Sequence, residues 1–178
     1  MPNWCSNQTK IGGPTKEIKR IWDILEDDTQ DDGLLSAMAP LDGDWEYNDA
    51  VNNWGTKWDI KGDHGLQFDE GKTYSEISGS FESAWSPPTI AFQTWLENNP
   101  ECDAELLYCE FANDFMGTLD AGDYTISQCS VSWLLGDEVG IKLEDAFGVL
   151  EMKEDLLEYE HNEILQEPLT LEDPETEV

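Results

Sequence analysis

The chain has few of the residues on which most catalytic and metal sites depend. Its 178 residues include two histidines, His64 and His161, and its four cysteines form no Cys-x-x-Cys pair, so a zinc site is not expected. The motifs of serine hydrolases, phosphate loops, dinucleotide-binding folds and zinc proteases are also missing. With 40 acidic side chains some close pair is inevitable, so proximity of carboxylates carries no information. We therefore predict no enzymatic activity, no cofactor and no dedicated metal site.

Positive charge and long apolar runs are equally scarce. Nine Lys and Arg face 40 Asp and Glu, which gives a net charge of −31. Nucleic-acid binding is driven by Lys and Arg at the phosphates, so direct binding to nucleic acid is not expected. No apolar run is long enough to span a membrane, and residues 1–4 do not resemble a secretory signal. A cytoplasmic location with reduced, mostly buried thiols is the expectation.

Aromatic residues and acidic residues are what the chain has in abundance. Eight Trp, six Phe and five Tyr supply enough buried area for a folded core despite the charge. Three interpretations of the acidity stay open: it keeps the protein soluble, it reflects adaptation to a salty cell, or it binds a basic protein surface.

The first two-thirds of the sequence alternates strand and helix patterns. A strand over 4–11 precedes a helix over 15–25, whose apolar positions recur with helical spacing. A strand over 74–85, a helix opened by Ser86-Pro87-Pro88, and strands over 104–112 and 124–133 follow. Together with the strand described next, this order predicts an α+β ferredoxin-like sandwich. Its βαββαβ antiparallel sheet has two helices on one face, plus an extra strand.

The stretch Trp54-Gly55-Thr56-Lys57-Trp58-Asp59 places two tryptophans around a rare lysine. Alternation predicts a strand over 54–60 whose tryptophans point into the core, with Lys57 on the other face, paired with Asp59 or Glu82. The alternative is that these aromatic rings are exposed and stack on a nucleobase. Core packing is favoured for two reasons. The residues around the tryptophans are acidic rather than basic, and the apolar stripe of the helix over 15–25 needs an apolar surface of the sheet to pack against. The predicted aromatic core is Trp22, Trp54, Trp58, Phe81, Trp85 and Trp95.

After Gly136 the sequence becomes an acidic extension. We predict a domain over 1–135, an extension over 136–167 that contains an amphipathic helix over about 143–166, and a disordered acidic tail over 168–178. The apolar stripe of this helix can pack on the domain's own sheet, bind a partner, or pair with a second copy to form a homodimer.

Four blocks of sequence resemble one family. The start Met1-Pro2-Asn3-Trp4-Cys5-Ser6-Asn7, the block 54–59, the block 81–88 (Phe-Glu-Ser-Ala-Trp-Ser-Pro-Pro) and the block 110–117 are similar to the "MPNWCSN" proteins of bacteriophages and plasmids, a YubB-like ferredoxin-like family. The resemblance covers about residues 1–130. It implies the same βαββαβ sheet and a mobile-element origin. It does not imply a particular activity, because the family has no established enzymatic function to carry over.

These observations predict a non-enzymatic accessory protein of a phage or plasmid that binds and modulates a basic host protein. The partner could be a nucleic-acid enzyme, with the acidic surface acting as a DNA mimic or counter-defence inhibitor. A small-ligand or nucleotide-binding module and a self-assembling structural protein are the alternatives. The candidate partner-binding residues are Asp27, Asp28, Asp31, Asp32, Glu151, Glu154, Asp155, Glu158 and Glu160.

Overall fold

The computed structural model describes residues 3–62, 64–120, 125–129 and 138–149. Contacts divide the chain after Phe147, and the fold is that of the first unit, Met1–Phe147. The acids of the predicted C-terminal helix (Glu151, Glu154, Asp155, Glu158 and Glu160) and the predicted tail lie outside the described residues.

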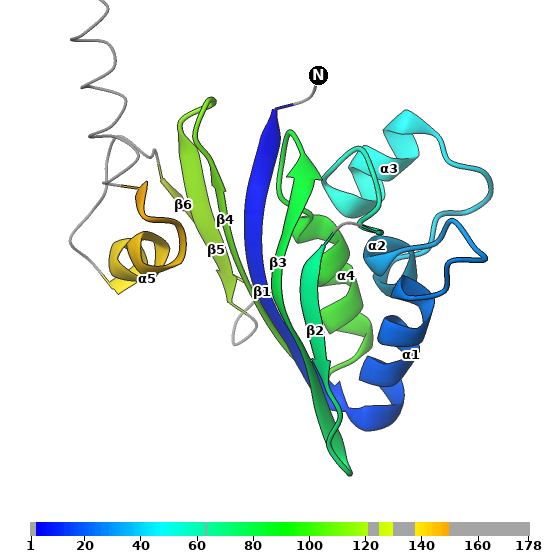
Figure 1. Ribbon diagram of the computed structural model, residues 1–178. Helices are drawn as coiled ribbons and strands as arrows, with labels where there is room; N and C mark the ends of the chain where they lie inside the picture. The colour runs from blue at the N-terminus through cyan, green and yellow to red at the C-terminus, as the bar shows by residue number, and fades with distance from the viewer. Residues whose placement is uncertain (1–2, 63, 121–124, 130–137, 150–178) are drawn as a thin grey trace, which may run out of the picture. The chain divides into compact units, whose positions relative to one another are not determined.

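A six-stranded antiparallel sheet with helices on both faces forms this α+β unit (Figure 1). The strands are β1 (Trp4–Pro14), β2 (Gly65–Asp69), β3 (Tyr74–Ala84), β4 (Asp103–Glu110), β5 (Phe115–Asp120) and β6 (Thr125–Cys129), in the order β2-β3-β1-β4-β5-β6. The helices are α1 (Thr15–Leu25), α2 (Leu34–Met38), α3 (Tyr47–Trp54), α4 (Thr89–Asn98) and α5 (Glu138–Phe147).

The core lies between the sheet and the helices α1 to α4. Alternate residues of β1 and β3 are buried, among them Ile11 and Ile77, which are opposite each other in the sheet. The stripe of α1 packs there as the sequence predicts, with Ile18 and Ile21 fully buried. The antiparallel α+β arrangement predicted from the sequence is confirmed at this level.

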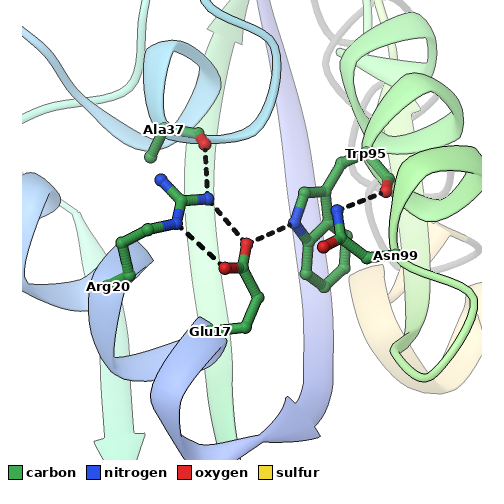
Figure 2. A network of polar contacts seen from close by, with 5 residues as sticks. All are labelled: Glu17, Arg20, Ala37, Trp95 and Asn99. Atoms are coloured by element: carbon green, nitrogen blue, oxygen red, sulfur yellow. Dashed lines mark hydrogen bonds and ion pairs between the residues drawn. The ribbon is translucent and has the colours of Figure 1, made fainter.

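A polar contact between helices closes the core at the start of α1 (Figure 2). Glu17 accepts hydrogen bonds from the indole Nε1 of Trp95 at 3.0 Å and from Arg20 Nη2 at 2.6 Å, and Arg20 also donates to the carbonyl oxygen of Ala37 at 2.9 Å. Helices α1, α2 and α4 are thus joined through the Glu17–Arg20 pair. The hydrogen bonds from Arg20, and then from Trp95, lower the pKa of Glu17 below its ordinary value.

The second strand of the prediction is wrong, and the physical reason is local. Residues 47–54 form α3, and Gly55 ends it in the left-handed conformation at φ 86°. Ala50 and Trp54 are one helical turn apart and are both buried. This helical spacing is hard to detect in the sequence, because most of the residues around it are Asn and Asp, which have low helix propensity. The strand that pairs with β3 at this edge of the sheet is β2, in a segment for which the sequence analysis predicts no strand.

The other differences concern strand limits near the C-terminal side of the sheet. Strand β5, in which Gly117 is opposite Tyr108, lies between the predicted strands over 104–112 and 124–133 and was not itself predicted. The predicted strand over 124–133 corresponds to β6 in its described part. Helix α5 overlaps only the start of the predicted C-terminal helix, and it packs on the sheet face away from α1 to α4. There Lys142 pairs with Glu105 at 2.9 Å and Gln8 donates to the carbonyl oxygen of Ala146 at 2.6 Å.

No helix in the described part of the chain is both long and apolar enough to cross a membrane.

Candidate functional site

Exposed aromatic rings gather at the end of the sheet where β1 begins and β3 ends. Trp58 is 39% exposed and Trp85 is 41% exposed, so the prediction that these two residues belong to the core is wrong. Trp54, Phe81 and Trp95 are buried as predicted, and Trp22 lies at the core margin, stacked on Phe68. The sequence pattern could not separate these cases, because Trp54 and Trp58 lie on either side of the helix end at Gly55.

The exposed rings form one continuous patch, which we call the aromatic surface (Trp4, Trp45, Tyr47, Trp58 and Trp85). The ring centroids of Trp4 and Trp58 are 6.0 Å apart, and those of Tyr47 and Trp85 are 6.4 Å apart. Trp45 donates its indole N–H to the backbone carbonyl of Lys57 at 3.1 Å. A patch of this kind is not needed to hold the core together.

Lys57 joins the two halves of the aromatic surface. Its Nζ lies 4.5 Å from the ring centroid of Trp58 and 5.0 Å from that of Trp85, which is cation–π geometry. The prediction that Lys57 faces away from the tryptophans and pairs with Asp59 or Glu82 is therefore wrong. The two carboxylates have other partners: Glu82 accepts the hydroxyl of Ser6 at 2.9 Å, and Asp59 is bound to the backbone.

Asp59 fixes the loop that carries Trp58. Its carboxylate accepts four backbone N–H groups, those of Gly33, Leu35, Ser36 and Ile60, at 2.7–3.1 Å. Three of these lie at the N-terminus of α2, where amides have no partner within the helix, so a distant acid caps α2. The sequence contains no signal for this cap, because 24 residues separate Leu35 from Asp59.

Trp85 is held in a conformation that bulky residues rarely adopt. Its φ is 69°, in the left-handed region, while its backbone N–H donates to the carbonyl oxygen of Asn3 at 2.9 Å. Such a residue costs about 1 kcal/mol relative to glycine. An exposed tryptophan that is kept in a strained conformation at a surface patch points to a role for the ring outside the core.

The blocks quoted for the family resemblance meet at this place. Trp4, Cys5 and Ser6 are opposite Ala84, Ser83 and Glu82 in the sheet, and Thr56 donates its hydroxyl to the carbonyl oxygen of Ala84 at 2.8 Å. The fourth block begins at the buried Glu110, whose carboxylate accepts the N–H groups of Ala112 and Asn113 in the turn between β4 and β5. Segments far apart in the sequence therefore build one corner of the unit.

Buried polar groups support the aromatic surface from behind. Asn7 donates to the carbonyl oxygen of Cys5 at 2.7 Å and to the hydroxyl of Ser83 at 2.8 Å. Burial raises the pKa of the Cys5 thiol to about 12, so at neutral pH it is protonated and a poor nucleophile. These groups position β1 against β3 rather than take part in chemistry.

Two cavities flank the aromatic surface. One of about 410 Å³ is lined by Trp4, Trp58, Ile60, Lys61, Glu82 and Ala84, among others. The second, of about 580 Å³, is lined by Trp45 together with the acids Asp31, Asp32 and Asp44. Asp59 borders both, so the aromatic surface is continuous with an acidic one.

The acidic loop between α1 and α2 is folded rather than loosely solvated. Lys61 donates its Nζ to the backbone carbonyls of Asp27, at 2.9 Å, and of Asp32. The carboxylate of Asp27 accepts hydrogen bonds from Thr29 and Gln30, and the bonds from Thr29 lower the pKa of Asp27. The side chains of the predicted partner-binding acids Asp28, Asp31 and Asp32 are exposed. Of the predicted set, the structure brings Asp31 and Asp32 next to the aromatic surface.

Among the described residues, no group of three His, Cys, Asp or Glu side chains is disposed to hold a metal ion. No protein-family model matches the sequence, and no curated protein or solved structure is measurably similar to it.

Proposed function

We propose that this chain is a non-enzymatic accessory protein of a phage or plasmid that binds a basic host protein and modulates it. The observation that carries the proposal is the exposure of Trp58 and Trp85 in an aromatic surface whose Trp45 shares a cavity with Asp31, Asp32 and Asp44. Tryptophan and tyrosine are the residues most enriched at the energetic centres of protein interfaces. Carboxylates around them favour a partner whose surface carries Lys and Arg.

The overall charge supports the same kind of partner. A net charge of −31 repels nucleic acid and acidic proteins, and it speeds encounter with a basic surface in a salt-dependent way. If the partner is a nucleic-acid enzyme, the acids of the loop 27–32 take the place of phosphates, and the protein acts as a DNA mimic in counter-defence.

The finer fold assignment and the family membership belong to the same proposal. The order β2-β3-β1-β4, with α1 after β1 and α4 after β3, is compatible with a ferredoxin-like sandwich extended by β5 and β6. The meeting of the family-like blocks at the aromatic surface supports membership of the "MPNWCSN" family.

Affinity capture from a bacterial lysate, with matched charge variants, tests the proposal. The wild-type chain should retain a basic protein at low salt and release it as salt rises. The double variant Asp31→Asn/Asp32→Asn should lose that protein. The control Glu97→Gln/Glu101→Gln, which removes one exposed charge in the last turn of α4 and one just beyond that helix, should keep it. Failure to recover any basic protein, or equal loss with both variants, contradicts the proposal.

A small-ligand or nucleotide-binding module is the second candidate, favoured by the cavity beside Trp4 and Trp58. A thermal-shift screen against nucleotides and metabolites separates the two functions. Stabilisation at micromolar ligand would support the module, and the binding protein predicts no such shift.

A further inference from the structure

We infer that the cavity beside Trp4 and Trp58 receives an arginine side chain of the partner, with its guanidinium paired to Glu82. This inference rests on the proposed function and names the contact that the partner makes at the aromatic surface.

The walls of the cavity suit a side chain that is apolar along its length and charged at its end. Trp4 and Trp58, inclined at 45° to each other, form one wall, and Ile60 and Ala84 add apolar surface. The planar guanidinium of arginine stacks on indole faces, and its methylene groups gain from apolar contact. A compact ammonium ion makes less use of such walls.

Glu82 is the carboxylate that is placed to pair with this guanidinium. The other acid at the cavity, Asp59, already accepts four backbone N–H groups. The cation at the cavity, Lys61, has its Nζ bound to the carbonyls of Asp27 and Asp32, so its stem lines the cavity while its charge is directed to the acidic loop. Glu82 is exposed, and among the described residues it accepts a side-chain hydrogen bond only from the hydroxyl of Ser6.

The partner's backbone has room beside the cavity. Strand β2 pairs with β3 only from Glu76 to Ser80, and β3 continues to Ala84 without it. The cavity lies along this continuation, next to Glu82, Ser83 and Ala84. An approaching segment therefore meets the last residues of β3 where β2 no longer covers them.

A second copy of this chain does not supply the arginine. Arg20 is the only arginine in the sequence. It is bound to Glu17 and to the carbonyl oxygen of Ala37 in the layer formed by helices α1 to α4, which we call the helix layer. Charge also argues against self-association here, because both copies carry −31. The occupant is a different, basic protein.

The test uses the full chain and an octapeptide that alternates glycine with arginine, compared with the same peptide carrying citrulline, the uncharged isostere. Calorimetry at low salt measures affinity, and the indole N–H signals in the NMR spectrum report on each tryptophan. We expect the arginine peptide to shift the signals of Trp4 and Trp58. We expect Trp58→Ala and Glu82→Gln each to weaken binding about tenfold.

Two control variants separate the site from general attraction to an acidic protein. Glu76→Gln removes a charge from the same face of β3, roughly 20 Å along the strand. Tyr74→Ala removes an exposed ring at the far end of β3. Both should bind like the wild type. Since Trp58→Ala changes no charge, its effect cannot come from electrostatic attraction alone.

Three outcomes overturn the inference: no binding of the arginine peptide, equal binding of the citrulline peptide, or equal weakening by Glu76→Gln and Glu82→Gln. The proposed function fails separately. If the peptide occupies the cavity but lysate capture yields no basic protein, the arginine site is supported and the proposed function is contradicted. If a basic protein is captured and the Trp58→Ala variant still binds it fully, the proposed function is supported and the arginine site is contradicted.

Discussion

The helix layer and the aromatic surface use tryptophan in opposite ways. In the helix layer Trp95 is 1% exposed and donates its indole N–H to Glu17, so its apolar area and its polar group are both used by the fold (Figure 2). At the aromatic surface Trp58 and Trp85 keep about two-fifths of their area in solvent and are held by a lysine. The number of aromatic residues therefore does not by itself measure the size of the core of this protein.

Removing a tryptophan should destabilise the protein strongly in the layer of helices α1 to α4 and weakly at the aromatic surface. Trp95→Ala should lower the free energy of unfolding by about 3–5 kcal/mol, because it opens a cavity and leaves Glu17 without one donor. Trp58→Ala should cost less than about 1 kcal/mol, as exposed positions do. Urea denaturation followed by circular dichroism measures both. Equal losses would remove the distinction between core and surface tryptophans.

Asp59 tests whether the aromatic surface depends on the cap of α2. Asp59→Ala should cost about 2 kcal/mol, since the amides at the start of a helix lose a charged acceptor. Asp44→Ala, an exposed acid at the neighbouring cavity, should stay within about 0.5 kcal/mol of the wild type. The same denaturation experiment compares them. A loss at Asp59 no larger than that at Asp44 would show that the cap adds little.

The strain at Trp85 can be measured with two substitutions at one position. Trp85→Gly should be more stable than Trp85→Ala by about 1 kcal/mol, because glycine accepts the left-handed backbone and alanine does not. At Trp58, whose φ is not positive, the order should reverse, with alanine the more stable. If alanine is also the better residue at position 85, the backbone there is not strained.

The smallest effect concerns the acid response of the helix layer. The lowered pKa of Glu17 means that its contribution to stability is fully present above the unfolded pKa of about 4.3 and is lost as pH falls through the lower folded pKa. Protonation of many other carboxylates relieves repulsion in the same range, so the informative quantity is the difference between wild type and Glu17→Gln.

That difference should shrink with acid by no more than about 1 kcal/mol, because the Glu17–Arg20 pair is partly solvated. Denaturation at a series of pH values measures it, and NMR titration of Glu17 checks the pKa directly. A difference that does not change between neutral pH and strong acid would contradict the assigned hydrogen bonds.

The sequence could predict the elements whose pattern is local and strong. The stripe on α1, the alternation along β3 and the proline signal before α4 all reflect side chains that must share one face, so spacing alone reveals them. Elements with weak local patterns were missed: α3 is rich in Asn and Asp, β2 has five residues, and β5 contains Gly117.

The candidate site was predictable only in part. The charge of the chain led to a predicted set of partner-binding acids, and this set includes Asp31 and Asp32, which line a cavity together with Trp45 of the aromatic surface. The roles of Trp58, Lys57 and Asp59 were not visible. Alternation in a six-residue stretch looks the same whether the chain continues as a strand or turns at a left-handed glycine.

The amino-acid sequence alone accounts for a strongly acidic chain with enough aromatic rings to fold, and for the local periodicity of its strongest strands and helices. Which of the aromatic rings face water depends instead on tertiary contacts. Burial depends on what other segments cover, and here Gly55 turns the chain and Asp59 ties it to α2. Trp58 therefore lies outside the core, although it follows the buried Trp54 closely in the sequence.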